Sequence, residues 1–398
     1  MKGTGVTMKI TDVETILLSY RYQTDEKWKW SGGATLQRNC VLVRVTVDDR
    51  IVGLGEIGES AYLPRAIEKM IEYRFKPMLL GEDPFDMEKI WQKMYIQSAH
   101  YGRRGVIATV ISGIDIALYD IIGKILNQPV YNLLGGRYRN KFKAYASGGM
   151  SKGIDELAAE AKDYLERGYF GLKVRIGNEE PEADIELVQE LRDRIGRKAA
   201  LLVDAGQCYT NFPWTYDTAY RVCKKLEPCD LFWLEEPLHP DDVEGFERLN
   251  KSTSIPIVAG ENEFTRYGFE PLIARHAVDM IQPDVTRSGG ISECKKIAAI
   301  AAAHSMRCAP HIFGSGVGFM ANMHFIASTP NAFIMEHDQT LNPLREELLL
   351  KPIVYKDGYV ELIQDLPGLG VELRGETIKK YAYNDEDAVK KGEFIPVF

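Results

Sequence analysis

The chain has 398 residues, and 45% of them are hydrophobic, which is enough to bury a large core. Charges of both signs are mixed throughout, and the formal net charge of −8 argues against nucleic acid or an anionic membrane surface as the main partner. A small anionic substrate is compatible with this charge, because a metal ion and a few local cations can set the field in one cleft.

The six cysteines include no C-x-x-C pair, and in a chain of this length they favour buried, reduced thiols over a disulfide framework. The N-terminus, MKGTGVTMKI, lacks the apolar region of a signal peptide, and we expect residues 1–7 to form a flexible extension. The longest apolar stretch, residues 106–126, is interrupted by charged residues and predicts an amphipathic core helix, not a membrane span. We therefore expect a cytoplasmic protein.

The first part of the chain changes from strand-like to helix-like patterns. Residues 8–60 are rich in β-branched residues and contain alternating runs such as CVLVRVTV, which predicts strands. Within them, the polar and aromatic segment TDEKWKWSGG at residues 24–33 is typical of a mobile loop. Residues 61–135 carry apolar residues at helical spacing and end at a pair of glycines. Strands followed by helices predict an α+β domain over residues 1–140.

From residue 141 to residue 340, short apolar runs alternate with helical stretches. The runs are FKAYAS, FGLKVRI, ALLVDAG, LFWLEEP, IPIVAGE, DMIQPD, MRCAPHI and AFIMEHD. Strict alternation predicts a parallel sheet, and about eight such units over this length fit a closed β/α barrel better than an open sheet. Residues 341–398 return to strand-like and turn-like patterns, and we expect this tail to pack back on the first domain.

In a parallel barrel the active site lies at the C-terminal ends of the strands, so the polar residues that end the runs are the candidate site. They are Lys173, Arg175, Asp204, Glu235, Glu261, Asp284, His311 and Glu336. Every run from the second onward delivers at least one charged or titratable group, although barrel strands are otherwise apolar. This coincidence predicts one catalytic centre.

Three consecutive runs end in an acid: Asp204, Glu235 and Glu261. One such acid alone would indicate only a solvated loop charge. Three oxygen ligands without cysteine or histidine suit a hard cation such as Mg²⁺, which keeps positions for water or substrate. Glu236 adjoins Glu235, but neighbours on a strand point to opposite sides, so we assign Glu235 to the metal. Asn262 and Glu263 are lesser candidates of the same kind.

The next two runs end in Asp284 and His311. An acid beside a histidine orients the ring and stabilises the imidazolium, so we expect His311 to act as a general base. The alternative for any lone histidine is a satisfied position in the core, and we assign that role to His324, which lies in a helical context.

Lys173 and Arg175 are two residues apart and share one face of their strand. Two cations that face a barrel interior are costly unless they meet an anion, and a substrate carboxylate is the natural one. The alternative partners are the metal-binding acids. Glu336 is expected across the barrel from the metal, where it would either donate a proton to an enolate oxygen or accept a hydrogen bond.

Short motifs at these positions run over nearly the whole chain: SGIDIALYDIIGK…LLGG, K-V-R, V-D-A-G, L-E-E-P, A-G-E-N, P-D…S-G-G, A-P-H and M-E-H. Together they resemble the mandelate racemase-like branch of the enolase superfamily. The resemblance implies a modified TIM barrel, (β/α)7β, with an N-terminal α+β capping domain that the C-terminal tail completes. It also implies one Mg²⁺ on the three acids, the Asp284–His311 dyad, and removal of the proton next to a carboxylate through an enolate.

One motif departs from the two-base members of that branch, which carry K-x-K on the second barrel strand. Here the strand reads Lys173-Val174-Arg175, and arginine is a poor base because it is effectively always protonated. His311 then remains as the one competent base. This favours elimination of water, in which one residue can remove the α-proton and then protonate the leaving hydroxide.

The branch's commonest substrates for such a dehydration are sugar acids, and the expected product is a 2-keto-3-deoxy acid. The C-terminal sequence LNPLREELL…PGLGVEL also resembles that of acid-sugar dehydratases. Some of these enzymes carry a histidine two residues after the third-strand aspartate. Gly206 occupies that position here, which disfavours their subgroup.

Three alternatives stay open. A racemase or epimerase would use Lys173 or a perturbed Arg175 as the second base, and a cycloisomerase is a weaker choice. A non-catalytic binding protein is the remotest, because the metal acids and the dyad are all present. We expect a small anionic carboxylate as the ligand and assembly into a homo-oligomer.

Substrate specificity is expected to come from two loops of the first domain, residues 24–33 and 100–106. Their candidate substrate-binding residues are Lys27, Trp28, Lys29, Arg103 and Arg104, which could reach a distal hydroxyl or a second carboxylate. The alternative for each of them is an ordinary surface position.

Overall fold

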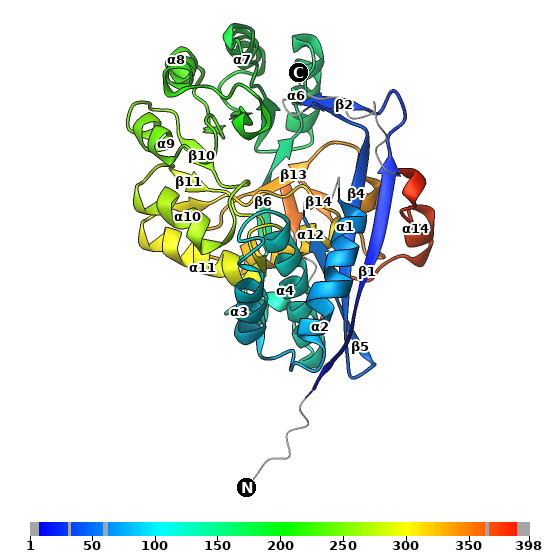
Figure 1. Cartoon of the computed structure of the whole chain (residues 1–398). Coiled ribbons are helices and arrows are strands. Elements are labelled where there is room, and N and C mark those ends of the chain that lie inside the picture. The colour runs from blue at the N-terminus through cyan, green and yellow to red at the C-terminus, as the bar shows by residue number, and fades with distance from the viewer. Residues whose placement is uncertain (1–7, 31–32, 59–62, 363–365, 388–398) are drawn as a thin grey trace.

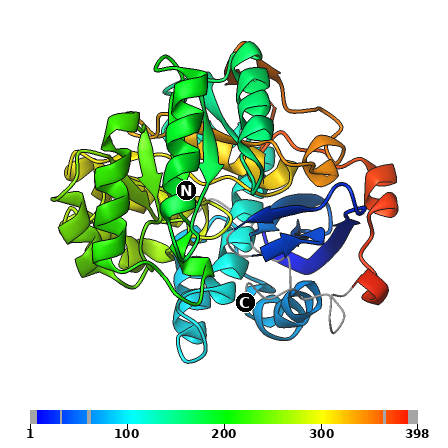
Figure 2. The same cartoon turned by 90° about the horizontal axis from the view of Figure 1, so that it is seen from above.

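The structure is a computed structural model that describes residues 8–30, 33–58, 63–362 and 366–387. The extension expected at residues 1–7 lies outside these ranges. Figure 1 shows an N-terminal α+β cap, blue to cyan, next to a β/α barrel, green to orange. The view from above in Figure 2 shows the same two parts beside each other.

The cap contains a three-stranded antiparallel sheet, in the order β1-β4-β5, and a short hairpin formed by β2 and β3. Its strands are β1 (Ile10–Arg21), β2 (Trp28–Trp30), β3 (Gly33–Thr35), β4 (Gln37–Val47) and β5 (Ile51–Ile57). Its helices are α1 (Pro64–Met70), the π-helix η1 (Ile71–Phe75), α2 (Lys76–Leu79), α3 (Met87–Ser98), α4 (Val106–Ile125) and α5 (Val130–Leu133). The expected order of strands and then helices is confirmed, but the segment at 24–33 is not simply a loop, because it contains β2.

The second part is a barrel in which strands and helices alternate in the (β/α)7β order. Its strands are β6 (Lys141–Ser147), β7 (Gly171–Arg175), β8 (Ala200–Asp204), β9 (Trp233–Glu235), β10 (Ile257–Ala259), β11 (Met280–Ile281), β12 (Arg307–Cys308) and β13 (Met335–Asp338). Its helices are α6 (Ile154–Glu166), α7 (Glu182–Ile195), α8 (Tyr216–Leu226), α9 (Val243–Asn250), α10 (Thr265–Ala274), α11 (Gly290–Ala303) and α12 (Gly316–Ala327). Parallel pairing of β13 with β6, and a parallel bridge between Cys308 and Ala332, close the barrel.

Alternation along the strands explains why polar residues gather at one end of the barrel. A layer of apolar and aromatic side chains fills the interior: Tyr145, Leu202, Trp233, Val258, Met280, Ala309 and Ile334. Because strand side chains alternate between the two faces, the inward positions recur every two residues. The candidate acids Asp204, Glu235 and Glu336 each lie two residues further along the chain, after Leu202, Trp233 and Ile334. The apolar layer therefore forms the floor of the site.

Helix α4 is the core helix of the cap and packs on β5. Gly53 and Gly55 make this close approach possible, because a Cβ at either position would lie 2.2 or 1.9 Å from a carbonyl oxygen of α4. By its length and composition the helix could cross a membrane, but 89% of its most apolar 18-residue stretch is buried inside the protein. The predicted core position of this helix is confirmed, but its buried surface is not confined to one face, because the cap sheet covers one side of α4 and the barrel helix α11 covers another.

The C-terminal segment contacts both parts. It contains α13 (Pro343–Glu346), β14 (Tyr355–Lys356), β15 (Tyr359–Glu361) and α14 (Gly375–Lys380), and α14 lies beside β1 in Figure 1. Strand β15 pairs with the first half of β6 in the barrel. Backbone hydrogen bonds from Ser19 to Tyr381, 2.8 Å, and from Tyr383 to Leu17, 3.0 Å, join the segment to the edge of the cap sheet.

Candidate active site

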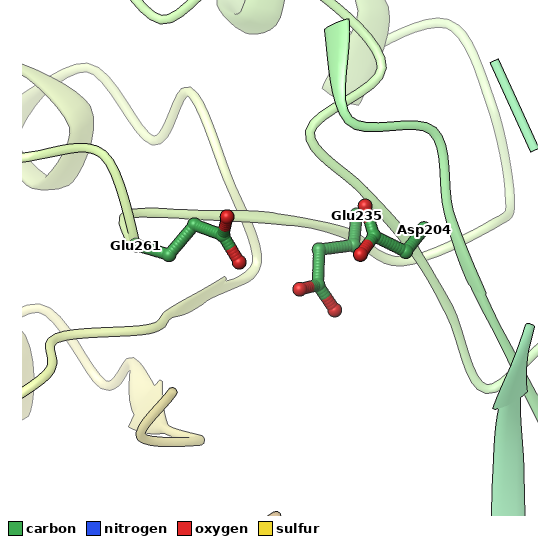
Figure 3. Close-up of side chains that lie close together, drawn as sticks. All are labelled: Asp204, Glu235 and Glu261. Carbon is green, nitrogen blue, oxygen red and sulfur yellow. The ribbon is translucent and has the colours of Figure 1, made fainter. Parts of the chain in front are cut away.

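Three buried carboxylates point toward one another at the C-terminal ends of neighbouring barrel strands (Figure 3). Asp204 ends β8, Glu235 ends β9, and Glu261 lies two residues after β10. One oxygen from each of them lies within 4.8 Å of the others. Asp204 and Glu235 are paired neighbours in the parallel ladder, so their side chains are at the same height, and Glu261 faces them.

Glu236 points away from this group. Its carboxylate accepts hydrogen bonds from Gly260 N at 3.0 Å and from Asn262 Nδ2 at 3.2 Å. Its backbone φ of 46° leaves the extended region directly after β9. Among the described residues, the group of acids close enough to share a metal ion therefore contains neither Glu236 nor Glu263.

His311 and Asp284 form a buried pair. His311 Nδ1 donates to Asp284 Oδ2 at 2.9 Å, and Nε2 is directed toward the acids, 3.6 Å from Glu261 Oε2. Burial lowers the pKa of His311, but the charges of Glu261 and Asp284 outweigh burial and raise this pKa to about 10. A cation bound to Glu261 would neutralise the carboxylate that contributes most to the raised pKa of His311.

The second oxygen of Asp284 is fixed by other groups. Asp284 Oδ1 accepts from Thr286 N and Thr286 Oγ1, both at 2.8 Å, and from Asn322 Nδ2 at 3.2 Å. Only Oδ2 then faces the imidazole, so the ring is held in one orientation. The pKa of Asp284 is lowered, because its bonds to His311 and Thr286 outweigh burial. Sequence reasoning missed both supports: Thr286 had a local signal in the D-x-T spacing, whereas Asn322 on α12 had none.

Lys173 and Arg175 face the barrel interior, as their shared strand face predicts. Lys173 is 1% exposed, and its Nζ lies 2.8 Å from Glu235 Oε1 and 3.8 Å from Asp204 Oδ2. Arg175 Nε lies 3.7 Å from Asp204 Oδ2, and its Nη1 donates to Gly148 O at 2.6 Å. The two cations thus border the three acids on the same side, with Lys173 in the deeper position.

Glu336 on β13 completes this side of the site. Its Oε1 lies 2.9 Å from Lys173 Nζ, and its Oε2 accepts from Ile312 N at 3.0 Å. Burial raises the pKa of Glu336, but Lys173 and His311 outweigh burial and lower this pKa to about 2. The structure therefore favours the second expected role, a hydrogen-bond acceptor, over a protonated donor.

The β2-β3 hairpin of the cap covers two loops of the site with aromatic rings. Trp28 packs edge-on against Phe313, with ring centroids 6.1 Å apart, and Phe313 stacks on His311 at 6.2 Å. Trp30 packs edge-on against Tyr209 at 4.7 Å, and the Tyr209 hydroxyl donates to Glu261 Oε1 at 2.9 Å. Phe313 and Tyr209 were not predicted, although both follow strand ends within a few residues of an assigned group.

The charged candidates of the cap lie farther out. Lys27 and Lys29 are exposed, and the backbone carbonyl of Lys29 accepts from Ser151 N at 2.9 Å. The Arg104 side chain is 56% exposed and reaches Asp241 at 3.4 Å and Glu263 at 3.9 Å. Of the predicted substrate-binding residues, Trp28 is the one whose ring touches a neighbour of the dyad.

The donor set fits a hard divalent cation. It consists of three buried carboxylates, and the burial of Glu235 together with its acidic neighbours raises the pKa of this residue to about 8, with Lys173 acting in the opposite direction. Buried carboxylates that crowd together need a compensating cation. Oxygen ligands alone are typical of Mg²⁺, and Asp204, Glu235 and Glu261 would hold it.

Two family models match the chain: the N-terminal domain of mandelate racemase/muconate lactonizing enzyme over residues 13–135, and an enolase C-terminal domain-like model over residues 156–378. The chain belongs to the mandelate racemase/muconate lactonizing enzyme family. This membership in the enolase superfamily confirms the resemblance seen in the sequence motifs.

Relatives in this family have different named activities. A D-galactarolactone cycloisomerase of Agrobacterium fabrum is 34% identical and covers 95% of this chain and 100% of its own length. An arabinonate dehydratase of Saccharolobus solfataricus is also 34% identical and covers 94% of this chain and 99% of its own. The structure of a racemase from Streptomyces coelicolor A3(2) with bound magnesium is 30% identical, with a TM-score of 0.84 over 94% of this chain and 100% of that one.

Proposed function

We propose that this protein is a Mg²⁺-dependent dehydratase that converts a sugar acid into a 2-keto-3-deoxy acid and water. The observation that carries the proposal is the His311–Asp284 pair, which directs one competent base toward the three acids, with Lys173 and Arg175 next to those acids. The arabinonate dehydratase among the relatives and the magnesium in the racemase structure support the reaction class and the metal.

The residues divide the elimination among them. When bound, Mg²⁺ supplies positive charge at the substrate carboxylate, which acidifies the neighbouring C–H bond. His311 Nε2 removes the proton from C2, and Asp284 stabilises the resulting imidazolium. The same imidazolium protonates the hydroxyl that leaves C3 as water, and the enol product tautomerises to the 2-keto acid. One base therefore serves both proton transfers.

The two cations of β7 hold the substrate carboxylate. Arg175 has a partly exposed guanidinium beside Asp204 and keeps its charge at any working pH, so it binds an anion and is a poor proton acceptor. A racemase needs a base on each face of the substrate. The K-V-R strand therefore favours dehydration over racemisation.

A cycloisomerase is the second candidate, because the cycloisomerase of A. fabrum is as similar to this chain as the dehydratase is. Its chemistry needs the same parts, since ring opening of a lactone or ether by elimination also begins with removal of an α-proton by one base. The two functions differ in the leaving group and not in the catalytic residues.

A substrate screen tests the proposal. The purified protein with Mg²⁺ would be incubated with a library of mono- and diacid sugars and their lactones, and 2-keto acids would be detected with semicarbazide. The His311→Asn variant is the control for background reaction. Formation of a 2-keto-3-deoxy acid from an open-chain acid supports the dehydratase, and activity on lactones alone supports the cycloisomerase.

A parallel incubation in D₂O covers the remaining outcomes. Deuterium that enters the α-position without elimination would replace the dehydratase by a racemase or epimerase. An absence of both turnover and exchange, together with a lack of Mg²⁺ binding, would support a non-catalytic binding protein.

A further inference from the structure

One carboxylate of the cap reaches into the barrel next to the dyad. Glu56 lies on β5 and is 3% exposed. Gly53 and Gly55 of this strand face α4, so strand alternation turns Leu54 and Glu56 toward the barrel. Leu54 belongs to the same hydrophobic cluster as buried residues of α12 such as Val317 and Met320.

Glu56 binds the start of α12. Its Oε1 accepts from Ser315 N at 2.8 Å, and its Oε2 accepts from Ser315 Oγ at 2.5 Å and from Gly318 N at 2.7 Å. These backbone N–H groups have no partner within the helix, and a negative charge is favourable at this end of a helix. Burial raises the pKa of Glu56, whereas its bonds to Ser315 and Gly318 lower it.

The barrel has a space shaped for this carboxylate. A Cβ at Gly314 would lie 2.6 Å from Glu56 Oε1, and a Cβ at Gly318 would lie 2.7 Å from Glu56 Oε2. Both distances are far shorter than a normal contact, so glycine is required at both positions while Glu56 stays in place. Side chains of other residues there would displace the carboxylate from the helix.

The helix that Glu56 binds is the one that supports the dyad. Ser315 is only four residues after His311, and Asn322 on α12 donates to Asp284 Oδ1 at 3.2 Å. The cap supports the other partner of this oxygen as well, because Gly58 N donates to Thr286 O at 3.0 Å. Thr286 is therefore bonded to the cap directly, and Asn322 lies on the helix whose start is bonded to Glu56.

We propose that Glu56 is a positioning residue for the Asp284–His311 pair: it holds α12, and through Asn322 it holds the Asp284 carboxylate. This proposal rests on the proposed dehydratase function only in the test that measures turnover. A purely structural role, in which Glu56 merely joins cap and barrel, is the opposing explanation.

Asp115 supplies a matched control for that explanation. It is a second buried cap carboxylate, and it accepts from Ser292 N at 3.0 Å and Ser292 Oγ at 2.6 Å near the start of α11. Its further contact runs through Ser292 to Tyr119 of the cap, at 3.4 Å, whereas the hydrogen bonds of the Asp284 carboxylate are to Thr286, Asn322 and His311. Asp115→Asn should therefore disturb the interface without disturbing the His311 hydrogen bond.

The first test reads the hydrogen bond directly and needs no substrate. A proton on His311 Nδ1 that is held by a carboxylate gives a far-downfield NMR signal, which His311→Asn would assign. We expect Glu56→Gln and Asn322→Ala to weaken or broaden this signal in folded protein, and Asp115→Asn to retain it. An unchanged signal in folded Glu56→Gln would overturn the proposal.

The second test uses turnover of the substrate found in the screen. Because misplacement of a catalytic group by about 1 Å can cost roughly 100-fold in rate, we expect Glu56→Gln to lower kcat by about 10- to 100-fold and leave KM nearly unchanged. Glu56→Asp should recover part of the loss, and Asp115→Asn should keep the kcat of the wild type. Equal losses in Glu56→Gln and Asp115→Asn would indicate a structural role. Wild-type protein without turnover would count against the dehydratase alone, and the NMR signal would still decide the role of Glu56.

Discussion

Arg175 and Asp204 are direct partners across β7 and β8, and the guanidinium Nε lies 3.7 Å from the carboxylate Oδ2. The residue that departs from the two-base pattern therefore stands next to a proposed metal ligand. The same guanidinium donates to the carbonyl of Gly148 at 2.6 Å, which fixes its plane. A lysine cannot reproduce this arrangement, because its single ammonium lacks the planar set of donors.

The first prediction concerns this position. Arg175→Lys should retain some dehydration with kcat/KM lowered about tenfold or more, since a charge-assisted hydrogen bond contributes about 1.5–3 kcal/mol. The lysine could also accept a proton, so the variant should exchange the α-proton with D₂O faster than wild type does, as followed by ¹H NMR. Arg175→Ala is the control for simple loss of charge. If Arg175→Ala also exchanged the α-proton faster than wild type, the introduced lysine could not be the base responsible for the exchange.

The second prediction concerns the base. His311→Asn should lower kcat by about 10²–10⁴-fold, because it removes the group assigned to both proton transfers. Asparagine has a similar size and can still bond to Asp284, so Mg²⁺ binding by calorimetry should stay close to wild type. Substantial turnover in this variant would move the base to another residue.

The third prediction concerns the metal. Mg²⁺ at about 100 times its Kd should stabilise the wild type by about 2.7 kcal/mol, because the ion binds only the folded chain. Glu261→Gln should lose most of this stabilisation, since it removes one of three ligand charges. Glu236→Gln is the matched control: Glu236 is also buried, but its carboxylate points away from the triad, and this variant should still respond to Mg²⁺. Equal responses in the two variants would show that the triad is not the binding site.

The fourth prediction concerns the hairpin of the cap. Trp30→Ala removes an aromatic contact with Tyr209, and such contacts contribute about 0.5–1.5 kcal/mol, so KM should rise roughly 2- to 10-fold. Lys27→Ala should change KM little, because Lys27 is exposed. A larger effect for Lys27 than for Trp30 would mean that charge, and not the aromatic rings, selects the substrate at this loop.

The sequence predicted the barrel and the positions of its candidate site residues for one physical reason: parallel strands bring their C-terminal ends together, so the last polar residue of each run is placed by topology. The prediction of mostly buried cysteines also holds, since five of the six are buried. Alternation along β9 also predicted that Glu235 faces the other acids, although Glu236 itself has left the extended conformation, with a φ of 46°.

Contacts between segments far apart in the chain could not be predicted in this way. Asn322 lies on a helix that is buried along its whole length, so no amphipathic pattern marks the side that faces Asp284. Glu56 looks like an ordinary strand residue until α12 is placed against it. The burial of α4 on more than one face was not predicted for a related reason, because a helix between two layers has no exposed face to keep polar.

The last prediction concerns pH and stability at the cap interface. Burial raises the pKa of Asp115 to about 7, against the opposing effect of its bonds to Ser292. An unfolded aspartate has a pKa of about 3.9, so this group favours the folded state fully below about pH 4, and the contribution is lost as the pH rises toward 7. Asp115→Asn does not titrate. The free energy of unfolding of the wild type relative to the variant should therefore fall by an amount on the order of 2–4 kcal/mol between pH 4 and pH 8. Urea unfolding of both proteins across this range measures the difference, and a constant difference would show that Asp115 is ionised in the folded protein throughout.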